Sequence, residues 1–138
     1  MDKLLKSGAR FIFRITGLEY RQPMTPYLRD LHFLPITYRT QFKINVLVYK
    51  CLNNQAPNYL RSLLVTRLDE HNRQTRKDND ITWLNQPPLE KLNYKCRGFK
   101  YTAPITWNKL SFNIRDSPTL DCFKIRLKTF YFKEWLNQ

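Results

Sequence analysis

Glycine, cysteine and acidic residues are scarce in this sequence, and their scarcity excludes several classes of function. Three glycines in 138 residues are too few for the glycine-rich loop that cradles nucleotide phosphates. The three cysteines, Cys51, Cys96 and Cys122, form neither a CxxC pair nor the spacing of a zinc knuckle. We therefore expect reduced, mostly buried thiols in an intracellular protein of the nucleus or cytoplasm.

Long apolar runs are also missing. The longest early run, Phe11 to Phe13, is followed at once by Arg14, which argues against a secretory signal. No stretch of the sequence approaches the length needed to span a bilayer. We expect no membrane partner.

A catalytic acidic centre is not recognisable in the sequence. Phosphoryl transfer on nucleic acid needs carboxylates that hold magnesium ions. The two acidic clusters, residues 69–70 and 78–80, fall in a polar stretch that is typical of a solvated loop. His71 lies in the same stretch, while His32 adjoins apolar residues and is expected to pack or to cap a helix. We expect no metal, no cofactor, no small-molecule substrate and no enzymatic activity.

Positive charge is what the sequence has in abundance. Lys and Arg number 24 against 11 Asp and Glu, giving a formal net charge of +13. The excess is spread evenly, with +7 in residues 1–66 and +6 in residues 67–138. Such a field attracts polyanions, whereas a surface charged only for solubility usually mixes the two signs more evenly. We expect a nucleic-acid partner, RNA or DNA, bound without sequence specificity.

The pattern of apolar residues predicts an α+β fold that is mainly α: a compact bundle of about five helices, with a small β-hairpin inserted before the C-terminal helices. A hydrophobic fraction of 42% is enough for one packed domain. We expect a single module over residues 1–138, with a helical part (1–65), a polar loop (66–80), short strands (81–102) and C-terminal helices (103–138).

Caps and breakers place the individual elements. Thr25-Pro26 and Ser117-Pro118 each combine a hydroxyl cap with a proline in the first turn of a helix. Residues 81–84 and 94–102 are the strands that we expect to pair. The predicted helices cover residues 2–16, 25–31 and 37–52, a short stretch after Pro57, a stretch from residue 103, and residues 117–136.

Basic side chains gather in stripes on three of these helices, opposite or beside the apolar residues. Each stripe is either a phosphate-binding face or an ordinary solvated surface. In order of preference, the expected nucleic-acid contacts are Lys3, Lys6, Arg10 and Arg14; then Arg39, Lys43 and Lys50; then Lys124, Arg126 and Lys128.

The last predicted helix has two apolar stripes that lie nearly opposite each other. The main stripe runs through Phe123 and Leu127, and the second consists of Ile125, Phe132 and Leu136. Two apolar stripes indicate burial on both sides, by the domain itself and by a neighbour. The alternative function is therefore a structural or protein-interaction module, with the charge incidental.

Several runs of residues together resemble the C-terminal region of non-LTR (LINE-type, jockey-like) retrotransposon reverse transcriptase polyproteins. The resemblance covers nearly the whole chain, with the runs in the family's order and at similar spacing. They are residues 25–36 (TPYLRDLHFLPI, similar to TPxLxxLHWLPV), 39–50 with 56–60 (RTQFKINVLVYK and APNYL, similar to RxxFKxxxLxYKxLxxxAPxYL), 98–110 (GFKYTAPITWNKL, similar to GxRAFSxAAPxLWNxLP), and 114–115 with 123–129 and Phe132 (IR, FKIRLKT and F, similar to IRxxxSLxxFKxxLKTxLF).

The resemblance implies a non-catalytic fragment that follows the polymerase fingers and palm, at or beyond the thumb. Its partners would be the rest of the polyprotein and the template RNA or target DNA, and the catalytic carboxylates would lie outside this chain. Two positions depart from the family pattern: Lys100 stands where arginine is frequent, and Ser111 replaces the usual proline. As an alternative, the fragment would only pack on the thumb or associate with itself.

Overall fold

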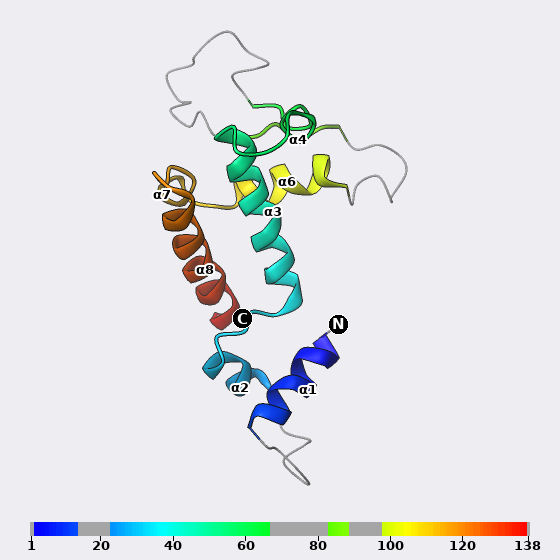
Figure 1. The fold of residues 1–138 in the computed structure, drawn as a ribbon, viewed down its shortest axis with the longest axis vertical. Coiled ribbons are helices and arrows are strands. Elements are labelled where there is room, and N and C mark those ends of the chain that lie inside the picture. The colour runs from blue at the N-terminus through cyan, green and yellow to red at the C-terminus, as the bar shows by residue number, and fades with distance from the viewer. Residues whose placement is uncertain (1, 14–22, 67–82, 89–97, 138) are drawn as a thin grey trace.

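The computed structural model describes residues 2–13, 23–66, 83–88 and 98–137, and these residues form seven helices (Figure 1). The prediction of a mainly helical fold is thus confirmed. The helices are α1 (Asp2–Ile12), α2 (Thr25–Asp30), α3 (Ile36–Leu52), α4 (Asn58–Arg61), α6 (Phe99–Asn108), α7 (Phe112–Arg115) and α8 (Leu120–Leu136).

The predicted β-hairpin is not supported by the described residues, which contain no strand. They contain one isolated antiparallel bridge, between Thr66 and Leu84. The side chain of Asn108 takes the place of a neighbouring strand: its Nδ2 donates to the Leu84 carbonyl oxygen at 2.8 Å and its Oδ1 accepts from the Leu84 amide at 3.1 Å. These two bonds satisfy the backbone of Leu84 without a β-ladder.

The second predicted strand, residues 94–102, is wrong for the part that the structure describes. Residues 99–102 belong to α6, because Tyr101, Pro104 and Trp107 recur every third residue and form one buried helical face. Pro104 therefore lies inside the helix, although the sequence pattern placed it near the start. Residues 81–82 and 94–97 of the predicted strands lie outside the described residues.

The core is built around the antiparallel pair α3 and α8. The Tyr38 ring packs on Tyr131 with centroids 5.8 Å apart, and the Tyr49 ring stacks on Phe123 at 4.5 Å. Residue numbers rise along α3 as they fall along α8, so the two helices run in opposite directions, side by side (Figure 1). Trp107 of α6 closes the core, with its ring 5.7 Å from Phe123.

Two buried hydrogen bonds help to fix the register of the helices within this apolar core. Asn45 Nδ2 donates to the Tyr131 hydroxyl oxygen at 2.6 Å, and the Tyr49 hydroxyl donates to the Ser117 carbonyl oxygen at 2.7 Å. Buried polar groups are costly when they lack a partner. Both bonds therefore favour one register of α3 against α8 and the turn before α8.

A second, smaller cluster joins α1 to α2 through Ala9, Met24 and Leu28, and Trp135 of α8 packs against it. Apolar residues at helical spacing over 2–16 predict that Leu4 and Phe11 lie on the inner face of α1, but the structure does not bury them. Leu4 and Phe11 are 78% and 85% exposed, because α1 meets α2 along the side that carries Ala9. The α1–α2 pair lies beyond the lower ends of α3 and α8 in Figure 1, so the bundle is less compact than the sequence suggested.

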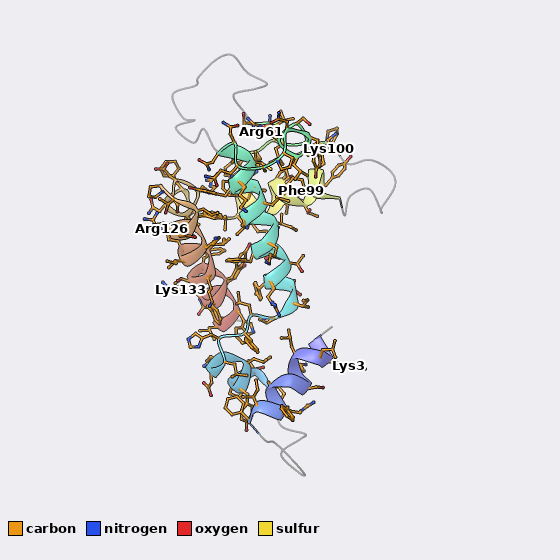
Figure 2. All side chains as sticks on the ribbon, in the orientation of Figure 1. Lys3, Arg61, Phe99, Lys100, Arg126 and Lys133 are labelled. Atoms are coloured by element: carbon orange, nitrogen blue, oxygen red, sulfur yellow. The ribbon has the colours of Figure 1, made fainter. Side chains whose placement is uncertain are left out.

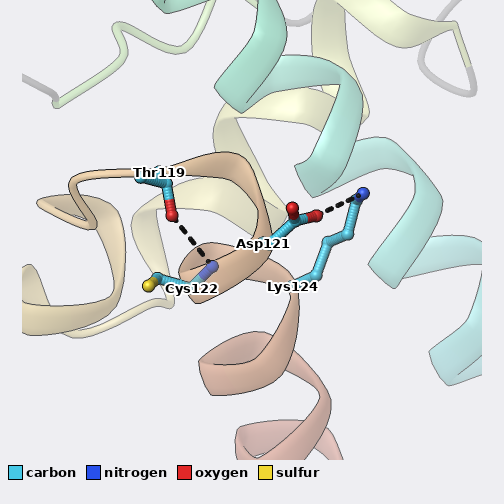
Figure 3. Close-up of polar contacts among 4 residues, drawn as sticks. All are labelled: Thr119, Asp121, Cys122 and Lys124. Carbon is cyan, nitrogen blue, oxygen red and sulfur yellow. Dashed lines mark hydrogen bonds and ion pairs between the residues drawn. The ribbon is translucent and has the colours of Figure 1, made fainter.

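The helix starts also differ in detail from the predictions. Met24, not Thr25, is the N-cap of α2, and no side chain caps it. The N-cap of α8 is Thr119, whose hydroxyl oxygen accepts from the Cys122 amide at 3.3 Å (Figure 3). Ser117 is buried and donates to the Ile114 carbonyl oxygen at 2.7 Å. An additional helix, α7, precedes α8 in the sequence and packs against it.

Candidate nucleic-acid interface

The turn between α2 and α3 positions an aromatic pair at the surface. Leu31 is the C-cap of α2, and the Phe33 amide then donates to the Leu28 carbonyl oxygen at 2.9 Å while the His32 amide donates to Arg29. This is a Schellman motif. His32 occupies its left-handed position, with φ 52°, and the motif sets the direction of the Phe33 side chain that follows.

A groove of about 420 Å³ opens beside this turn, between the start of α3 and the middle of α8. Its walls combine rings, one aliphatic side chain and three cations, without any carboxylate. The lining residues are His32, Phe33, Leu34, Arg39, Phe42, Lys43 and Lys128.

The three cations of the groove come from two helices. Arg39 and Lys43 lie one turn apart on α3, and Lys128 faces them from α8. The Lys128 ammonium also lies 5.8 Å from the centroid of the Phe132 ring, a cation–π contact with a residue just outside the groove. Within the described residues, no carboxylate forms an ion pair with any of the three. We call these three side chains the cationic triad.

Lys50 and Lys124 extend the same faces of α3 and α8. Helical periodicity places Lys50 in line with Arg39 and Lys43, and Lys124 one turn before Lys128. Lys50 is half-buried, and Lys124 is engaged by Asp121, whose carboxylate oxygen lies 3.0 Å from the ammonium (Figure 3). Neither lines the groove, so both are peripheral to it.

Arg126 lies elsewhere. Its guanidinium donates to the Asn113 carbonyl oxygen at 2.7 Å and to the Ser117 hydroxyl at 3.3 Å, which ties α8 to the chain around α7. Figure 2 shows Arg126 and Lys133 on the outer edge of α8, away from α3. Arg126 belongs to the same predicted set of contacts as Lys128, but side chains two positions apart on a helix point in nearly opposite directions.

The stripe on α1 is separate from the groove. Lys3 and Lys6 are exposed, Arg10 is half-buried, and Arg14 lies outside the described residues. Lys3 lies on α1, distant from the labelled side chains of α6 and α8 in Figure 2. The first-ranked group of predicted contacts is therefore not brought together with the other two.

The second apolar stripe of α8 does come together. Ile125, Phe132 and Leu136 line one shallow pocket of about 450 Å³, together with Arg29, His32, Lys128 and Thr129. Ile125 is 68% exposed and Leu136 is 43% exposed. Phe132 is half-buried and its ring lies 6.0 Å from that of His32. This apolar pocket adjoins the groove, with His32 and Lys128 common to both.

The aromatic residues in the wall of the groove, Phe33 and Phe42, were not among the predicted site residues. Phe33, in the turn after α2, is 40% exposed, and Phe42 shares a helix face with Arg39 and Lys43. The available signal in the sequence was a large apolar residue close to two cations. The groove itself forms only when α8 adds Lys128, which follows Lys43 by 85 residues.

Three other features bear on function: metal ligands, membrane-spanning helices and free thiols. Among the described residues, no group of three His, Cys, Asp or Glu side chains could hold a metal ion. None of the described helices has both the length and the apolar character to cross a membrane. Cys51 is a buried free thiol, as expected, whereas the free thiol of Cys122 is exposed. Cys96, His71 and both acidic clusters lie outside the described residues.

Comparison of the chain with models of protein families, with curated proteins and with solved structures finds no match.

Proposed function

We propose that this chain is a non-catalytic accessory part of a non-LTR retrotransposon reverse transcriptase, and that it helps the enzyme to hold template RNA or target DNA. The observation that carries the binding role is the convergence of Arg39, Lys43 and Lys128 on one groove without a carboxylate in its walls. The retrotransposon origin rests on the motif runs in the sequence.

The cationic triad provides positive charge that suits the phosphates of a nucleic acid. Three positive side chains from two antiparallel helices line one groove, where the phosphates of a strand would meet cations and no carboxylate. Contacts of this kind are electrostatic and independent of sequence. The absence of an ion-pair partner within the described residues also means that no internal salt bridge must break before a phosphate binds.

Replacing the triad by alanine (Arg39→Ala, Lys43→Ala, Lys128→Ala) tests this role. Each phosphate contact releases counterions, so the slope of log affinity against log salt should become shallower by about 2 to 3. Affinity for a labelled 20-residue oligonucleotide should fall roughly 10- to 100-fold at low salt. Fluorescence anisotropy at several salt concentrations measures both quantities.

A matched control has the same loss of charge at other sites. Lys100, Lys109 and Lys133 are exposed and lie outside the groove, so their triple alanine variant has the same net charge as the triad variant. We expect it to bind nearly as well as the parent chain. Equal loss of affinity in both variants would mean that binding depends on net charge and not on the groove. Wild-type affinity that does not change with salt concentration would exclude a phosphate interface.

The apolar pocket on α8 supports a second candidate role, association with another protein surface. Exposed Ile125 and Leu136 border Phe132, and such patches mark interaction sites. We expect a concentration-dependent dimer that Ile125→Lys with Leu136→Lys converts to monomer without loss of helix content. Sedimentation equilibrium with circular dichroism measures this. A wild-type chain that stays monomeric at its highest soluble concentration would rule out self-association.

A further inference from the structure

We propose that the groove takes an unpaired nucleotide, with its base against Phe33 and His32 and its flanking phosphates on the cationic triad, so that the chain prefers single-stranded to double-stranded nucleic acid. This inference rests on the proposed function and specifies its ligand.

The walls of the groove divide into a part for a base and a part for phosphates. His32, Phe33 and Phe42 present rings, and Arg39, Lys43 and Lys128 present charge. Proteins that hold single strands combine these two elements, because every base has a face that can stack on an aromatic ring. A volume of about 420 Å³ also falls in the range of sites for small organic groups.

A duplex could use only half of this groove. Its bases are paired and stacked inside the helix, so it can present phosphates to the cations but no free base face to Phe33. Flipping a base out would cost the stacking and pairing energy of that base. The rings should therefore add affinity for a single strand and add none for a duplex.

The Schellman turn fixes the backbone of His32 and places its ring at the groove. Its φ of 52° is a conformation that glycine or asparagine adopts more readily than histidine. The His32 ring is placed between the groove and the apolar pocket, 6.0 Å from the Phe132 ring.

The experiment compares a labelled 20-residue single strand with a 20-base-pair duplex in the full chain. The variants are Phe33→Ala, His32→Asn and the control Phe112→Ala, in which the exposed ring lies on α7, outside the groove. Asparagine tolerates the left-handed backbone, so His32→Asn removes the ring and preserves the turn. Circular dichroism confirms that each variant is folded.

We expect Phe33→Ala to weaken binding of the single strand about tenfold, and His32→Asn to weaken it by a smaller factor, with duplex binding unchanged. Phe112→Ala should change neither. Equal affinity of the wild-type chain for both ligands, or equal effects of Phe33→Ala on both, would overturn the single-strand preference. If the triad variant still loses affinity in that case, the phosphate interface stands and only the base site is wrong; if it does not, both fail.

Discussion

Truncation of Phe123 to alanine should remove a large part of the stability of the fold. The Phe123 ring is fully buried, stacks on Tyr49 at 4.5 Å and packs beside Trp107 at 5.7 Å. It therefore joins α8 to both α3 and α6. Phenylalanine-to-alanine changes in packed cores cost about 3–5 kcal/mol, against a total stability of roughly 5–15 kcal/mol for a domain.

Urea denaturation followed by far-ultraviolet circular dichroism measures this loss. The matched control is again Phe112→Ala, because the Phe112 side chain is 47% exposed and surface changes usually alter stability by less than about 0.5 kcal/mol. A similar loss in both variants would mean that Phe123 is not the centre of the core. The binding predictions are independent of this one, because none of the groove variants removes a fully buried ring.

The long helices were predictable from the sequence for a simple physical reason. α3 and α8 carry apolar side chains at helical spacing over 17 residues each, so local pattern and tertiary burial agree. The start of α6 was misjudged because Phe99, Tyr101 and Lys100 alternate over too few residues to separate a strand from a helix. Leu84 was expected in a hairpin because sequence does not reveal that a side chain, Asn108, satisfies its backbone.

The candidate site was predictable in its parts but not in its assembly. Periodicity placed Arg39 with Lys43 on one helix and Lys128 on another, and these are local relations. Which stripes meet depends on the antiparallel packing of α3 on α8, fixed by distant pairs such as Asn45 with Tyr131. The stripe on α1 was ranked first because of its charge. Its helix packs on α2 and does not join the groove, and this tertiary contact cannot be read from the local sequence.

Alkaline pH should destabilise the protein through its buried tyrosines. Burial raises the pKa of Tyr131 well above its usual value near 10, the charge of Glu134 raises it further, and the hydrogen bond from Asn45 offsets a part. Burial likewise raises the pKa of Tyr38 and of Tyr49. The unfolded chain therefore loses these protons first, and the free energy of unfolding falls as the pH rises above about 10.

For each tyrosine that stays neutral in the folded state, the free energy of unfolding falls by up to about 1.4 kcal/mol per pH unit above pH 10. The three tyrosines together therefore produce a steep loss of stability at alkaline pH.

The variant Tyr131→Phe separates the two roles of the hydroxyl, as a hydrogen-bond acceptor and as an ionising group. At pH 8 it should be less stable than wild type by about 1–3 kcal/mol, because Asn45 Nδ2 loses its acceptor. Above pH 10 its stability should decline less steeply, because one ionising group is gone. Denaturant unfolding at pH 8, 10 and 11 gives both values, and identical pH slopes for the two proteins would show that Tyr131 ionises as readily in the folded chain as in the unfolded one.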